Sequence, residues 1–176
     1  EAAAELKERL AKLLGEQAEE VWASTFHSSC VRILRREITA LGGHYTSSFT
    51  IYDSDDSRRV IKECMKELNI DDKQLPPRSV QNMISAAKDK LLTREASAAG
   101  AGSGVRLTQV AKIFRAYQTR LENANALDFD DIIALTVRLL ETCPDVLEKY
   151  QRRFRYILVD EYQDTNLAQF RLVSLL

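Results

Sequence analysis

Four consecutive apolar residues near the end of the chain, Tyr156 to Val159, constrain its fold more than any other segment. They show no alternation of apolar and polar side chains, which is typical of a strand buried on both faces of a parallel sheet. Asp160 and Glu161 follow directly. Because open α/β sheets bind ligands beyond the carboxyl ends of their strands, both acids are expected at a ligand-binding edge.

These acids suit the chemistry of nucleotide hydrolysis. One carboxylate can hold Mg²⁺, and a second can accept a proton from the attacking water. By position, Asp160 is the expected metal ligand and Glu161 the expected general base. An apolar strand followed by Asp-Glu is equally compatible with an ordinary solvated turn, so this pattern alone leaves both interpretations open.

The rest of the chain is predicted to be mostly helical. Helices are predicted at residues 1–14, 29–41, 54–68, 80–92, 106–122, 129–141, 144–150 and 166–176, with a strand at 21–26 and a short extended piece at 49–52. Asp53, Ser79 and Asp128 are predicted to cap the helices that follow them. This order favours an α/β sheet protein interrupted by a helical insertion. Two strands cannot form such a sheet alone, so further strands are expected outside this sequence.

Composition narrows the class of protein. With 176 residues and 45% hydrophobic content the chain can bury a real core, and its net charge of −1 gives no bulk argument for nucleic acid. The cysteines, Cys30, Cys64 and Cys143, are odd in number and widely spaced, which favours reduced thiols over a zinc or redox site. No apolar run approaches the roughly 20 residues that span a bilayer, so no membrane association and a cytoplasmic location are expected.

Four short sequence motifs, called strings below, make the prediction of function more specific. DEYQDTN at 160–166 resembles motif II of the UvrD/Rep/PcrA-type superfamily 1A DNA helicases. TFHS at 25–28 and LDFDD at 127–131 resemble two further segments of that family, and AAELKER at 3–9 is similar to the tail of its motif Ia. The order and spacing of all four strings agree with the family, so the resemblance covers essentially the whole chain.

The resemblance implies an enzyme, an ATP-dependent helicase that uses Mg²⁺ and ATP, moves 3′ to 5′ on single-stranded DNA and separates duplex at a junction during DNA repair or replication. It implies a RecA-like, parallel-sheet P-loop NTPase domain formed by residues 1–28 and 152–176, with 29–151 as an inserted helical subdomain called 1B. The phosphate-binding loop is expected before Glu1 and the later motifs after Leu176. The isolated chain is therefore expected to be inactive.

The resemblance also assigns residues to the nucleotide. It gives Asp160 the Mg²⁺ and Glu161 the role of general base, and it counts Gln163 among the nucleotide-binding residues. A glycine-rich stretch at 97–104 is similar to the start of a phosphate-binding loop. It lacks both a preceding strand and the Lys-Ser/Thr that opens the following helix, so a surface loop or an artificial linker is the better interpretation.

Other residues are assigned to DNA. Thr25, His27 and Ser28 match positions near the DNA path, and Phe129 matches a position that lies against the bases, where aromatic stacking grips single strands without regard to sequence. A phenylalanine in the first turn of a helix is nevertheless more often part of a core. A lone histidine after a strand is usually a structural hydrogen-bonding residue.

Two basic surfaces are candidates for binding phosphate, and two alternative functions of the chain remain open. The predicted helix at 106–122 has a basic face, and Arg32, Arg35 and Arg36 cluster on another; either could neutralise phosphates, although charged helix faces are usually only solvated. The chain could also be a non-catalytic DNA-binding or protein-docking module, or part of a helicase subunit in a helicase-nuclease complex.

Overall fold

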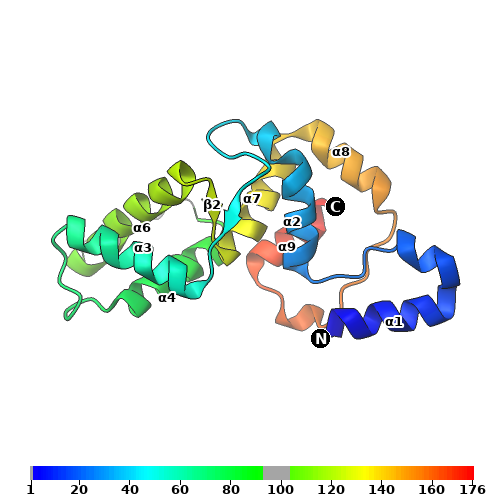
Figure 1. Cartoon of the computed structure of the whole chain (residues 1–176), viewed down its shortest axis with the longest axis horizontal. Helices are drawn as coiled ribbons and strands as arrows, with labels where there is room; N and C mark the ends of the chain where they lie inside the picture. Colours follow the sequence, from blue (N-terminus) through cyan, green and yellow to red (C-terminus); the bar gives the residue numbers. More distant parts are fainter. Residues whose placement is uncertain (1, 93–103) are drawn as a thin grey trace.

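Helices dominate the chain, which a computed structural model describes for residues 2–92 and 104–176 (Figure 1). The α-helices are α1 (Ala2–Leu14), α2 (Phe26–Glu37), α3 (Ser54–Glu67), α4 (Pro77–Asp89), α6 (Val105–Asn123), α7 (Phe129–Thr142), α8 (Pro144–Arg153) and α9 (Leu167–Leu175). Three 3-10 helices, η1 (Gly15–Glu20), η2 (Ile38–Leu41) and η3 (Tyr162–Asp164), and two short strands, β1 (Thr50–Ile51) and β2 (Ala126–Leu127), complete the described part of the chain.

Two hydrophobic cores hold these helices. The first joins α2, α7, α8 and α9, and includes the fully enclosed Leu34, Leu139 and Tyr150. The second joins α3, α4 and α6 around residues such as Ile113 and Tyr117. Figure 1 shows the second group as a separate lobe, with α7 between it and the rest. The α/β, helix-rich class is confirmed at this level, whereas the domain boundaries after residues 28 and 151 remain a prediction.

A parallel strand pair lies at the junction of the two cores. Thr50 pairs with Ala126 and Ile51 with Leu127. Ala126 belongs to the core of the α3–α4–α6 lobe, whereas its neighbour Leu127 belongs to the other core. The extended piece predicted at 49–52 is thereby confirmed, and β2 ends one residue before Asp128, the N-cap of α7.

Capping residues set the helix starts largely as predicted. Asp53 and Asp128 each accept a hydrogen bond from the backbone N–H three residues on, and each is answered by an aspartate in a reciprocal capping box. The cap predicted at Ser79 is wrong, because α4 already begins at Pro77. Proline suits the first helical position, where its missing N–H costs nothing.

The two strands predicted at 21–26 and 156–159 are wrong. The first segment is an unpaired loop that leads into α2 at Phe26, and the second is unpaired as well. Strands require hydrogen-bonding neighbours, and neither segment has one among the described residues. Tyr156 and Leu158 are accordingly 91% and 98% exposed.

Two other expectations concern membranes and the glycine-rich stretch. In the described ranges, no helix has the length and apolar character needed to cross a membrane. The surface loop predicted at 97–104 lies outside the described residues except for Gly104, the residue before α6.

Candidate functional site

The acids of the 160–166 string lie on an exposed turn. Asp160 accepts the N–H of Glu161 through Oδ1 at 2.9 Å, and Glu161 adopts a left-handed backbone with φ of 51°. Gln163 follows within η3, also exposed. The expectation that both acids stand at the end of a paired strand is therefore wrong for this chain. Their side chains are adjacent and open to solvent.

The donor set at this turn fits part of a magnesium site. Mg²⁺ in nucleotide sites is held by one or two carboxylates together with phosphates and water, and does not need a complete protein cage. The second oxygen of Asp160 has no partner among the described residues, so it could serve as such a ligand. No cluster of at least three metal-binding side chains occurs in the described ranges.

The end of this string is anchored to the helical lobe. The side chain of Asn166 caps α9 by accepting the N–H of Gln169 at 2.9 Å, and its amide donates to Asp89 Oδ1 at 2.8 Å. Burial raises the pKa of Asp89, and the nearby His27 opposes that shift. Asp89 therefore joins the start of α9 to the end of α4.

The TFHS residues form the start of α2. Thr25 is the N-cap, and its hydroxyl accepts the N–H of Ser28 at 3.2 Å while also contacting the Ser28 hydroxyl at 3.0 Å. His27 projects from the first turn and packs edge to face against Phe129, with ring centroids 5.5 Å apart. Two strings separated by about a hundred residues thus meet at one surface.

Phe129 is the first residue of α7 and is 52% exposed. Its ring is thus open to solvent beside His27, which excludes the alternative of an enclosed core residue. Contact with DNA by Thr25, His27, Ser28 and Phe129 remains a prediction. The exposed ring provides the geometry that base stacking requires.

A buried ion cluster flanks Phe129, and the sequence interpretation missed it. Lys88 Nζ lies 2.6 Å from Asp128 Oδ2 and 2.8 Å from Asp131 Oδ1, and all three side chains are less than a tenth exposed. The hydroxyl of Tyr117 donates to Asp128 Oδ2 at 2.8 Å. The residues on either side of Phe129 are therefore tied to α4 and α6.

The three ionisable groups of this cluster shift one another's pKa values. Burial alone would lower the pKa of Lys88, but the two carboxylates outweigh it and the pKa is raised. Burial raises the pKa of Asp131 to about 6, with a further contribution from Asp128. For Asp128 burial acts in the same direction, but Lys88 outweighs it and the pKa is lowered. Lys88 is therefore the group that keeps the cluster ionised.

The sequence did contain a signal for this lysine. Val80 and Ile84 lie on the buried stripe of α4 at a spacing of four residues, and Lys88 continues that stripe. A lysine on an apolar stripe, with two acids in a capping sequence elsewhere, is the pattern that could have predicted the cluster.

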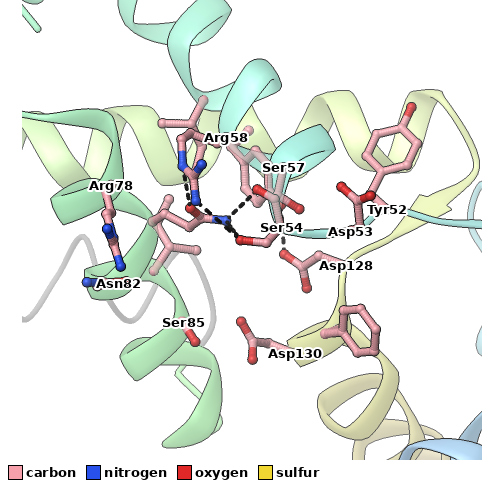
Figure 2. Close-up of a pocket in the computed structure, with 15 residues that line it drawn as sticks. Tyr52, Asp53, Ser54, Ser57, Arg58, Arg78, Asn82, Ser85, Asp128 and Asp130 are labelled. Atoms are coloured by element: carbon pink, nitrogen blue, oxygen red, sulfur yellow. Dashed lines mark hydrogen bonds between the residues drawn. The ribbon is translucent and has the colours of Figure 1, made fainter.

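A polar cavity of about 260 Å³ opens between α3, α4 and the start of α7 (Figure 2). Its walls include Arg58, Arg78 and Asn82, together with Phe129 and Asp130. None of residues 160–166 lines it. The exposed ring of Phe129 therefore borders both the His27 surface and a separate cavity.

Several arginines of the two basic surfaces are engaged within the chain. Arg32 lies 4.0 Å from the centre of the Trp22 ring, and Arg35 lies 3.7 Å from that of Phe49. Arg120 pairs with Glu63 and Glu67, linking α6 to α3. These contacts give the arginines structural roles, and phosphate binding by the surfaces remains a prediction.

Comparison with known proteins gives a matching family and similar proteins for this chain. The UvrD/REP helicase N-terminal domain matches residues 1–176. The ATP-dependent DNA helicase PcrA of Staphylococcus aureus (strain Mu50 / ATCC 700699) is 49% identical over 175 residues, which cover 99% of this chain and 24% of that protein. The ATP-dependent DNA helicase UvrD1 of Mycobacterium tuberculosis (strain CDC 1551 / Oshkosh) is 48% identical over 174 residues, 98% of this chain and 22% of that protein. The chain thus spans about a quarter of the length of these relatives.

Proposed function

Because this chain belongs to the UvrD/REP helicase N-terminal domain family, we propose that it is part of an ATP-dependent DNA helicase that moves 3′ to 5′ on single-stranded DNA. The resemblance noted in its strings is confirmed by that membership. The observation that carries the proposal is the meeting of His27 and the half-exposed Phe129 at one surface, next to the helix that anchors the end of the 160–166 string.

The nucleotide half of the proposal rests on the exposed acids. Asp160 would hold Mg²⁺, Glu161 would accept the proton of the attacking water, and Gln163 would contact the nucleotide. Bound Mg-ATP supplies the phosphoanhydride bond that is cleaved and a cation that neutralises phosphate charge. In the proposed complete motor these residues belong to a RecA-like domain whose other strands, lying outside this sequence, would pair with 156–159. That pairing would cover Tyr156 and Leu158.

The proposed binding of DNA rests on the aromatic surface formed by His27 and Phe129. Phe129 would stack on a base of single-stranded DNA, with His27 alongside it and the hydroxyls of Thr25 and Ser28 near the backbone. Stacking tolerates every base because each one has a π-face, which suits a motor that must move along any sequence. A junction of single-stranded and duplex DNA would be its substrate, in repair or replication. Residues 29–151 would form subdomain 1B of such a motor.

The test separates hydrolysis from DNA binding in a full-length helicase that contains this chain. Glu161→Gln keeps the side-chain volume but removes the base, so DNA-stimulated ATP hydrolysis should fall by about 10²- to 10⁴-fold while DNA binding persists. Phe129→Ala should instead weaken single-strand affinity by about 1–3 kcal/mol. Glu19→Gln, at an exposed glutamate in η1, is the matched control and should change neither.

Two outcomes would contradict the proposal. Normal ATP turnover by Glu161→Gln would remove Glu161 from the reaction. Unchanged DNA affinity in Phe129→Ala would remove the ring from the DNA path. Direction is measured separately, because displacement should require a 3′ single-stranded tail on the partly duplex substrate and fail with a 5′ tail.

A further inference from the structure

We propose that Asp89 is a positioning residue for ATP hydrolysis, through which DNA bound at the surface formed by His27 and Phe129 accelerates turnover. It acts by holding the side chain of Asn166, and thereby the nucleotide turn, defined as residues 160–165. This inference rests on the proposed function, because it connects the proposed DNA surface with the proposed hydrolytic residues. A motor has to hydrolyse ATP in response to its track, so such a connection is needed in the molecule.

One asparagine side chain joins the start of α9 to the carboxyl end of α4. The amide nitrogen of Asn166 donates to Asp89 Oδ1 at 2.8 Å, and Asn166 Oδ1 accepts the N–H of Gln169 at 2.9 Å. Asp89 is the last residue of α4 and lies 77 positions before Asn166 in the sequence. Because its acceptor is a carboxylate, this hydrogen bond is charge-assisted and stronger than a neutral one. Asn166 is therefore fixed from two sides, as a donor towards α4 and as an acceptor towards α9.

Short-range hydrogen bonds make the nucleotide turn continuous with Asn166. The hydroxyl of Thr165 donates to the carbonyl of Tyr162 at 2.8 Å. The N–H of Asp164 donates to the carbonyl of Glu161 at 2.9 Å. These bonds span the interval between Asn166 and the proposed general base, so the position of Asn166 sets the position of Glu161.

Within the described ranges, residues 160–166 make one hydrogen bond to a part of the chain other than themselves and α9. It is the bond from Asn166 to Asp89. Residues 160–164 are exposed, so α9 and this bond are what place them. A movement of the end of α4 is therefore transmitted to the nucleotide turn at this point.

The same end of α4 also holds the DNA surface. Lys88, the residue before Asp89, pairs with the two carboxylates of the buried cluster that flanks Phe129. His27 is close enough to Asp89 to oppose the rise that burial causes in the pKa of the Asp89 carboxyl. Two consecutive residues of one helix thus hold the start of α7 and the nucleotide turn. This is the kind of contiguous packed network that carries energetic coupling between two sites.

The first experiment replaces the donor of this bond in a full-length helicase that contains this chain. Asn166→Asp keeps an oxygen to cap α9, since aspartate is as good an N-cap as asparagine, but it turns a carboxylate towards Asp89. The readout is the ratio of kcat for ATP with saturating oligo(dT) to kcat without DNA. This ratio should fall about 2- to 30-fold, the range for substitutions along a connecting network. Asn123→Asp, at an exposed asparagine at the end of α6, is the matched control and should leave the ratio unchanged.

Exchanging the two side chains should restore the ratio. In the double variant with Asp89→Asn and Asn166→Asp, the amide introduced at position 89 can donate to the carboxylate introduced at position 166, which still caps α9. The net charge is unchanged, and the ratio should return to within about twofold of the unmodified value. Asp89→Ala removes only the acceptor and leaves the cap of α9 intact, so it should lower the ratio as Asn166→Asp does.

The role of Asp89 would be overturned by a normal ratio in both Asn166→Asp and Asp89→Ala. An equal fall of kcat with and without DNA would overturn it too, because a purely structural bond lowers both and leaves their ratio unchanged. The third contrary result is a double variant that does not restore the ratio.

Failure of this role is distinguishable from failure of the proposed function. If Glu161→Gln lowers turnover and Phe129→Ala weakens DNA binding while Asp89→Ala keeps the normal ratio, the proposed function stands and the role of Asp89 is wrong. If DNA does not stimulate the unmodified helicase at all, both are overturned.

Discussion

Replacing Lys88 by methionine should destabilise the chain more than any exposed lysine substitution. Lys88 Nζ lies 2.6 Å from Asp128 and 2.8 Å from Asp131, and its side chain is 4% exposed. Methionine keeps much of the side-chain volume but leaves two carboxylates buried without a cation. Breaking a buried ion pair from one side costs about 3–5 kcal/mol, because the remaining charge is uncompensated.

Urea unfolding followed by circular dichroism measures this loss. With a slope of about 2 kcal/mol per molar urea, the midpoint should fall by roughly 1.5–2.5 M at pH 7. Lys90→Met is the matched control, since Lys90 is exposed at the end of the same helix, and its midpoint should change little. A Lys88→Met midpoint equal to that of Lys90→Met would refute the assignment of a stabilising charge to Lys88.

The pH dependence of the stability loss in Lys88→Met tests the same assignment independently. Asp131 has a folded-state pKa of about 6, above its unfolded value, so its contribution to stability is present at low pH and is lost as pH rises from about 4 to 6. Without Lys88 both carboxylates should hold protons more strongly in the folded state. The deficit of Lys88→Met should therefore be smaller at pH 5 than at pH 8, and a deficit that grows on acidification would contradict this account.

Three further predictions concern other parts of the chain. Asn166→Ala removes both the cap of α9 and the bond to Asp89, so thermal unfolding should show a loss of about 1–2 kcal/mol, and a change below 0.5 kcal/mol would count against the cap. Burial raises the pKa of the Cys30 thiol to about 12, so a thiol reagent at pH 8 should label Cys143 first and Cys30 only on unfolding, as mass spectrometry of tryptic peptides would reveal. Leu158→Ser should leave the stability of the 176-residue chain within about 0.5 kcal/mol, because the side chain is 98% exposed; a larger loss would mean that the segment is packed in solution.

Local signals in the sequence predicted the helices well. The capping aspartates at 53 and 128 need only the backbone N–H groups of the next turn, so their effect is decided within four residues. Pro144 starts α8 for the same reason, since a missing N–H is tolerated only there. Helix starts of this kind do not depend on contacts with distant parts of the chain.

The strands failed because their stability is not local. The apolar run at 156–159 can become a strand only where neighbouring strands satisfy its backbone, and no described residue does so. The pair that does form, at 50–51 and 126–127, depends on the packing of two cores far apart in sequence. Lys88 was missed for a related reason: its partners lie 40 and 43 residues away, and the distance is closed only by tertiary structure.

The candidate site combines an exposed apolar ring with a buried charged cluster. Phe129 forgoes part of the roughly 1.5–3 kcal/mol that full burial of such a side chain contributes. Its neighbours Asp128 and Asp131 are instead buried at the cost of desolvation, and Lys88 and Tyr117 hold them in place. Well-packed hydrophobic residues could often fill the same volume at no loss of stability, so stability alone does not account for the cluster. An exposed ring held on both sides by a network of ion pairs and hydrogen bonds is the arrangement that the proposed stacking of DNA bases on Phe129 would require.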